Sequence, residues 1–147
     1  MKKQILAITA AFLLSASITF ANDRSTVPDP IVNELHQAFK SATNIQWKTT
    51  ASFYKASFTQ GNQSFDVFYA FDGTLMGVSR KITIEQLPLN LLKDTQEKGS
   101  ADQVTDLFEM LTDKGTEYFI TFGTGKEKKV YKSSGYAWSR YTASTFE

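Results

Sequence analysis

The sequence predicts an α+β protein in which a helix followed by four antiparallel strands occurs twice, with the helices packed on one face of the sheet. Apolar residues recur at helical spacing in two places, and each time a series of period-two segments follows. Glycine-containing turn signals separate these segments. The two halves also correspond at a shift of about 60 residues, as expected for an internal repeat.

The first 21 residues are predicted to be a secretory signal peptide and not part of the fold. Lys2 and Lys3 open the segment, residues 5–20 are apolar apart from small hydroxyl residues, and small residues precede a cleavage site before Asn22. An N-terminal membrane anchor is the alternative. The segment is near the short limit for a span, so we expect no stable anchor after cleavage.

The remaining chain is predicted to form one domain. Residues 22–27 read as a polar lead-in, residues 28–83 as the first helix-plus-four-strand repeat and residues 84–147 as the second. Without the signal peptide the chain has 126 residues, which is enough to bury a hydrophobic core.

Composition excludes several classes of site. The chain has no cysteine and one histidine, so disulfides, thiolate nucleophiles, cysteine zinc sites and His-rich metal centres are excluded. The processed chain carries 14 basic and 15 acidic residues, a net charge of −1, which argues against a nucleic-acid partner. The one lysine cluster is interpreted as a solvated strand edge. Its members are Lys126, Lys128, Lys129 and Lys132.

In the first half, Asp29 and Pro30 are expected to open a helix, with Asp29 as its cap. The apolar face of that helix ends near residues 41–44. Strands are then predicted around residues 45–48, 53–59, 63–71 and 74–82. The Asp72-Gly73 pair is a strong hairpin signal, because glycine accepts the positive φ of such turns.

In the second half, a helical stretch begins at Leu87-Pro88 and closes at residues 98–99. Strands are predicted at residues 117–122, 128–133 and 136–143. Residues Val104 to Leu111 give conflicting signals, since their apolar positions have helical spacing while the repeat predicts a strand. We follow the repeat and expect a strand.

Signals for catalysis are weak. His36 lies on the first helix, and a lone histidine there is more often a surface or packing residue than a base. Nothing in the spacing of Asp66 and Asp72 places the two carboxylates together. Residues 123–126 resemble a phosphate loop only faintly and are better explained as a hairpin turn. We therefore expect a protein that is not an enzyme and has no cofactor or metal.

Aromatic residues are the more informative feature, with 18 left after removal of the signal peptide. If one sheet face packs under the helices, alternation turns Phe53, Phe68 and Phe119 to the opposite face, and Trp47 could join either. One interpretation is that helices, a loop or a second protomer cover that face. The other is an exposed aromatic surface for a partner, for which Trp47, Phe53, Phe68 and Phe119 are the candidate binding residues.

The order of these motifs resembles the exported PepSY-like proteins, which are similar to beta-lactamase inhibitor proteins. The resemblance rests on the first helix, on Asn44-Ile45-Gln46-Trp47, on the strand that runs into Phe71-Asp72-Gly73, and on the restart at Leu87-Pro88. It implies tandem helix-plus-four-strand repeats with a curved sheet surface. It also implies a non-enzymatic protein of the periplasm or the extracellular space. In the inhibitor proteins the concave sheet face and its loops grip an enzyme, and PepSY domains are proposed to bind or restrain peptidases.

The sequence therefore favours a secreted or periplasmic, non-catalytic binding module, an inhibitor or modulator of an extracytoplasmic protein or peptidase acting through its sheet surface. Its partner would be an extracytoplasmic protein or peptide, with hairpin tips around Gly61, Gly73 and Gly125 as the rim. The alternative is a carrier of a small apolar or lipid-like ligand held between sheet and helices. A hydrolase with an unrecognised site is a third, weaker interpretation.

Overall fold

The computed structural model describes residues 24–98, 103–123 and 127–142. In the described residues, eight strands form one sheet in which neighbours in the chain are neighbours in the sheet, all antiparallel. The predicted signal peptide, residues 1–21, lies outside the described residues.

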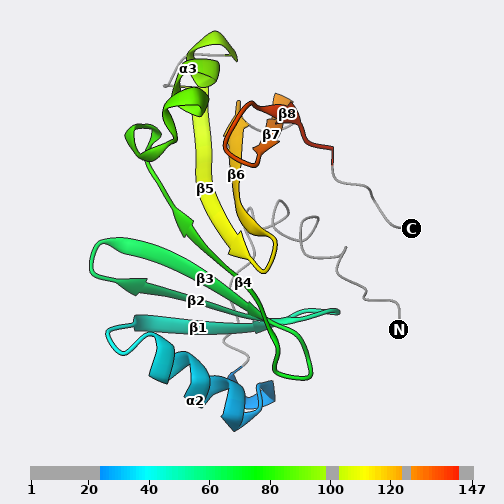
Figure 1. The fold of residues 1–147 in the computed structure, drawn as a ribbon. Helices are drawn as coiled ribbons and strands as arrows, with labels where there is room; N and C mark the ends of the chain where they lie inside the picture. Colours follow the sequence, from blue (N-terminus) through cyan, green and yellow to red (C-terminus); the bar gives the residue numbers. More distant parts are fainter. Residues whose placement is uncertain (1–23, 99–102, 124–126, 143–147) are drawn as a thin grey trace.

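Within the described residues, each half of the molecule supplies one α-helix and four strands (Figure 1). The first half contains the 3₁₀ turn η2 (Arg24–Thr26), α2 (Asp29–Ala38), β1 (Thr43–Thr49), β2 (Tyr54–Gln60), β3 (Gln63–Tyr69) and β4 (Leu75–Lys81). The second contains the 3₁₀ turn η3 (Ile84–Gln86), α3 (Leu89–Lys98), β5 (Val104–Thr112), β6 (Gly115–Phe122), β7 (Lys129–Ser133) and β8 (Ser139–Arg140). The predicted α+β class and antiparallel sheet are confirmed, whereas the tandem helix-plus-four-strand repeat stays a prediction.

Residues Val104 to Leu111, whose sequence gave conflicting signals, lie in strand β5, so the predicted strand is confirmed. Its apolar residues do not share one face. Leu107 packs in the core beneath α3, whereas Phe108 and Met110 belong to a cluster on the other side of the sheet. Both faces of β5 are apolar, and the resulting pattern imitates helical spacing.

Helix α2 differs from the prediction at both ends. Pro28 is the N-cap residue and Asp29 is the first residue of the helix, so the Asp29 side chain does not cap it. The Asp29 carboxylate instead lies 3.0 Å from the Arg24 guanidinium. The helix ends at Ala38, earlier than expected, because the next residue, Phe39, leaves the helical conformation.

The second half shows two similar differences. Helix α3 begins at Leu89, since residues 84–86 form a 3₁₀ turn closed by a capping box between Thr83 and Gln86. The predicted last strand, residues 136–143, is reduced to Ser139–Arg140 in the described part of the chain.

Two hydrophobic cores lie between the sheet and the helices. Under α2, Ile31, Val32 and Leu35 pack against the sheet of the first half, and under α3, Leu91 packs against the second half. Figure 1 shows β1–β3 running across the view and β5–β6 nearly upright, so the sheet bends strongly between the halves. The sheet residues of the two cores are Trp47, Ala56, Phe58, Val67 and Tyr69, and Leu107, Ile120 and Phe122.

The register shows that both helices lie on the same face. Ala56 pairs with Val67, Val67 with Val78 and Val78 with Leu111, so the row beneath α2 continues into β5. Leu107 is four residues from Leu111 on the same strand and therefore shares its face, where α3 packs. We call this side the helix face and the opposite side the helix-free face.

Candidate functional site

The helix-free face carries a row of hydrogen-bonding side chains across the first four strands. Gln46 of β1 pairs with Ser57 of β2, Ser57 with Asp66 of β3, and Asp66 with Ser79 of β4. Paired residues of neighbouring strands point to the same face, so these four side chains form one line perpendicular to the strands. We call this line the polar row.

A cavity of about 530 Å³ lies along the polar row. Thr59 and Ser64 line it beside the row, and Asp106, Thr121 and Val130 extend the lining to β5, β6 and β7. Ser79 and Thr121 are buried, whereas Gln46 and Ser64 are exposed. The cavity therefore has buried hydroxyl groups from the middle of the sheet and an accessible rim at β1 and β3. Its other lining residues are Asn44, Phe58, Phe65, Arg80, Lys81, Thr105, Phe108 and Lys128.

Both aspartates that line the cavity face a lysine. Asp66 Oδ2 lies 3.7 Å from Lys55 Nζ, and the Ser57 hydroxyl donates a hydrogen bond to the same carboxylate. Asp106 Oδ1 lies 3.4 Å from Lys81 Nζ. That oxygen is buried and accepts no hydrogen bond from the described residues. The two ion pairs leave this part of the wall close to electrically neutral.

An aromatic cluster adjoins the cavity on the same face. Phe108 and Phe119 stack with ring centroids 5.0 Å apart, and Phe53 meets Phe68 edge-on at 5.6 Å. Residues of both halves meet in this cluster, so it fills the bend of the sheet. Its members are Phe53, Phe68, Phe108, Met110 and Phe119, with Met76 packed against them.

The four predicted partner-binding residues do not form an exposed aromatic surface. Phe53, Phe68 and Phe119 are 4%, 1% and 2% exposed and pack in the aromatic cluster of the helix-free face. Trp47 is 3% exposed and lies on the other face, in the core beneath α2. The predicted alternation of Phe68 and Phe119 was right, but their exposure was wrong because the bent sheet brings them together.

Asp66 and Lys128, which the sequence also singled out, line the cavity, whereas the other sequence candidates lie apart from it. His36 is exposed on α2. Asp72 belongs to the β3–β4 turn, where the Thr74 backbone N–H donates to its carboxylate at 2.9 Å, and this bond lowers the pKa of Asp72. Gly61 and Gly73 occupy hairpin turns with positive φ, as predicted. Gly125 and Lys126 fall outside the described residues.

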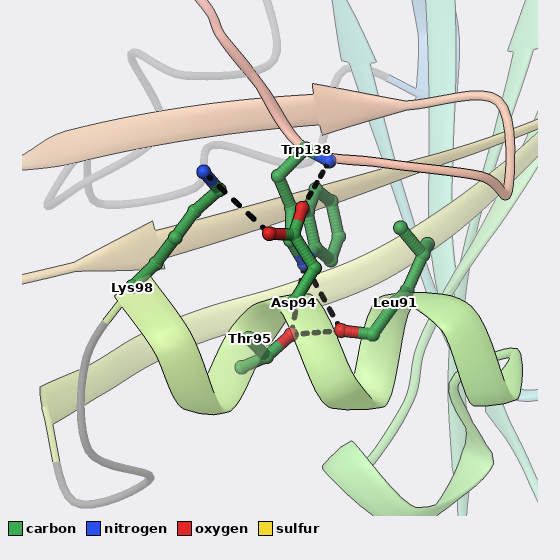
Figure 2. Close-up of polar contacts among 5 residues, drawn as sticks. All are labelled: Leu91, Asp94, Thr95, Lys98 and Trp138. Carbon is green, nitrogen blue, oxygen red and sulfur yellow. Dashed lines mark hydrogen bonds and ion pairs between the residues drawn. The ribbon is translucent and has the colours of Figure 1, made fainter.

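A polar cluster fastens the segment before β8 to helix α3 (Figure 2). The Trp138 indole N–H donates to Thr95 Oγ1 at 2.8 Å and to the Leu91 carbonyl at 3.3 Å. The Trp138 backbone N–H donates to Asp94 Oδ2 at 2.7 Å, and Lys98 pairs with the same carboxylate at 3.7 Å. We call these residues the Trp138 clamp. They tie the segment before β8 to α3 within the second half of the molecule.

The described residues contain neither a metal site nor a membrane-spanning helix. No group of three or more His, Asp or Glu side chains there could hold a metal ion. Neither α2 nor α3, with ten residues each, is long enough to cross a membrane, and no other described helix qualifies.

The sequence analysis does not predict the polar row, although the chain contains a signal for it. Serine, threonine or aspartate occupies alternate positions of two consecutive strands, at Ser57 and Thr59 and again at Ser64 and Asp66. Alternation of apolar residues indicates which face of a strand is buried, and the polar positions between them are expected to face solvent. Their alignment into one row depends on strand register, which alternation alone does not give.

Comparison with solved structures gives the fold. A BLIP-like protein from Bacteroides fragilis superposes with a TM-score of 0.66 at 20% identity, covering 86% of this chain and 94% of that one. A proposed periplasmic protein from Bacteroides eggerthii gives 0.69 at 16% identity, covering 78% and 88%. A DUF2874 family protein from Bacteroides uniformis gives 0.66 at 12% identity, covering 81% and 92%. No protein-family model and no curated protein matches the sequence.

These similarities show that the chain has a BLIP-like fold, BLIP being the abbreviation for beta-lactamase inhibitor protein. The identities are too low to transfer an activity, because function depends on the residues of a site and not on the fold. Membership of the PepSY-like group stays a prediction from the sequence.

Proposed function

We propose that this protein is an exported, non-catalytic binding module that takes its partner on the helix-free face of the sheet. The observation that carries the proposal is the cavity of about 530 Å³ on that face, lined by side chains of seven strands. Ligand sites are concave and combine an apolar wall with a few convergent polar groups. Here the polar row and the adjoining aromatic cluster supply both.

Export is supported by the predicted signal peptide and by the periplasmic description of one structural neighbour. A binding role agrees with the BLIP-like fold and with the weak signals for catalysis in the sequence. The partner expected from the sequence is an extracytoplasmic protein or peptide, and inhibition or modulation of that partner is the corresponding action.

The ligand-carrier alternative receives less support. It requires space between the sheet and the helices, yet Leu35 of α2 and Leu91 of α3 are fully buried in packed cores on that side. The cavity described above lies on the opposite face and is lined largely by polar side chains. An apolar or lipid-like ligand would offer no hydrogen bonds to these polar groups and would exclude water from them.

Site-specific photocrosslinking in the organism that makes the protein tests this proposal. A photoreactive phenylalanine derivative replaces Gln46, which is exposed at the rim of the cavity. The matched control carries the same group at Gln37, an exposed glutamine of α2 on the helix face. We expect a discrete adduct from position 46 and none from position 37. Adducts from position 37 alone, or equal adducts from both, would place the contact elsewhere.

A further inference from the structure

We propose that the polar row binds a short, linear glycan built of uncharged sugars. This inference rests on the proposed function, because it uses the same face and names the chemical class of ligand. The glycan could be free or attached to a protein, since the same sugar rings would be presented in either case.

The first argument is the chemistry of the lining. Eight uncharged side chains able to hydrogen-bond come from six strands, and every hydroxyl among them can both donate and accept a hydrogen bond. Sugar hydroxyls have the same dual capacity, so each can satisfy several protein groups. The side chains are Asn44, Gln46, Ser57, Thr59, Ser64, Ser79, Thr105 and Thr121.

The second argument is spacing. Gln46, Ser57, Asp66 and Ser79 come from four adjacent strands, and neighbouring strands lie about 4.8 Å apart. This interval is close to the length of one pyranose ring in an extended chain. A linear oligosaccharide that crosses the strands would therefore meet one polar side chain of the row at each ring.

The third argument is charge. Lys55 neutralises Asp66 and Lys81 neutralises Asp106, so the middle of the lining presents matched charges. A charged ligand would have to compete with these existing ion pairs. Lys128 adds one positive charge to the lining, which makes an anionic sugar the informative comparison.

The fourth argument is the apolar part of the lining. Phe108 of β5 and Val130 of β7 contribute to the wall at the end of the cavity away from β1. Sugar rings carry C–H groups on their faces, and these pack against apolar walls while the hydroxyls around the ring reach polar groups. The cavity thus offers both kinds of contact to one ligand.

The test is calorimetric titration of the processed chain, residues 22–147, with four probes. These are cellotetraose, tetra-N-acetylchitotetraose, tetragalacturonic acid and an extended, uncharged Ser/Thr-rich octapeptide. We expect one of the two neutral tetrasaccharides to bind, and to bind at least tenfold more tightly than its disaccharide, because the row spans four strands. The double variant Gln46→Ala/Ser64→Ala should weaken this binding about tenfold or more, since two exposed hydrogen-bonding groups are lost.

The control is Gln37→Ala/Ser41→Ala, which removes the same two residue types from exposed positions outside the cavity and should bind as the parent does. Preference for the anionic sugar or for the peptide, no binding of neutral sugar at millimolar concentration, or equal binding by the Gln46/Ser64 variant would overturn the glycan assignment. If any of these results is found while the photocrosslinked adduct at position 46 still forms, the glycan assignment is wrong and the proposed binding function remains supported. If the adduct at position 46 is absent too, both the glycan assignment and the proposed function are wrong.

Discussion

At the scale of single residues, the burial of Trp138 is a feature that the sequence pattern could not predict. The sequence analysis includes it in a predicted strand, residues 136–143, whereas in the structure it precedes the two-residue strand β8. Its buried position is set by hydrogen bonds to Leu91 and Thr95 of α3, more than 40 residues earlier in the chain. No local pattern carries information about such a contact.

The Trp138 clamp gives a stability prediction. Trp138→Phe removes the indole N–H and leaves a small void in the core beneath α3, so we expect a loss of about 2 kcal/mol in the free energy of unfolding. Thr95→Val removes the acceptor with little change in shape and should cost about 1 kcal/mol. Urea unfolding followed by circular dichroism measures both. The double variant should cost less than the sum of the two, and strict additivity would show that the indole–hydroxyl bond contributes nothing.

At the scale of secondary-structure elements, the sequence predicted the strand content of both halves and placed the ends of the helices less well. Period-two patterns and glycine turns were sufficient for β2, β3, β4 and β6. The start of α3 was missed because Leu87 and Pro88 follow a 3₁₀ turn and precede the helix. Strand β5 was correct only because the repeat was preferred to local spacing.

The join between β4 and β5 depends on one glycine. A Cβ atom at Gly77 would lie 2.8 Å from Met110 Cε and 3.0 Å from the Leu111 carbonyl oxygen. The methionine end can move aside, but the backbone oxygen belongs to the neighbouring strand. We therefore expect Gly77→Ala to lower the free energy of unfolding by about 1–3 kcal/mol, measured by urea titration. Ser64→Ala, an exposed change on β3, serves as the control. If Gly77→Ala leaves the free energy of unfolding unchanged, then β4 and β5 can move apart enough to accept the added methyl group without loss of stability.

At the scale of the whole molecule, the sequence predicted two sheet faces but not how the second one is covered. The faces follow from alternation, and Phe68 and Phe119 were correctly turned away from the helices. Their burial follows from the bend of the sheet, which brings the first and second halves into contact. That bend is a property of eight assembled strands, so it cannot be derived from any one of them. Phe53, Phe68 and Phe119 are buried for this reason, so the predicted exposure was wrong, while a role for these residues in binding stays a prediction.

Because the aromatic cluster joins the two halves, we expect the chain to unfold as one cooperative unit. The chain has two tryptophans, and each reports on one half: Trp47 lies in the core beneath α2 and Trp138 in the core beneath α3. Phe119→Ala should cost about 3–5 kcal/mol, because it leaves a large void in the cluster. In the Trp47→Phe variant only Trp138 fluoresces, and in the Trp138→Phe variant only Trp47 does. Adding Phe119→Ala to either variant should lower the free energy of unfolding by the same amount, as measured by the fluorescence of the remaining tryptophan.

The control for this experiment is Leu89→Ala, which changes a side chain that is 80% exposed and should leave both transitions in place. A shift confined to the Trp138 signal, with the Trp47 transition unchanged, would mean that the halves unfold independently. The cluster would then be a contact between two separately stable units, and the bend of the sheet, together with the cavity on its helix-free face, would be free to open without unfolding either half. If the Trp47 and Trp138 transitions shift together, the helix-free face takes its shape whenever the chain folds. A binding site on that face is then preformed, and binding requires no further conformational change.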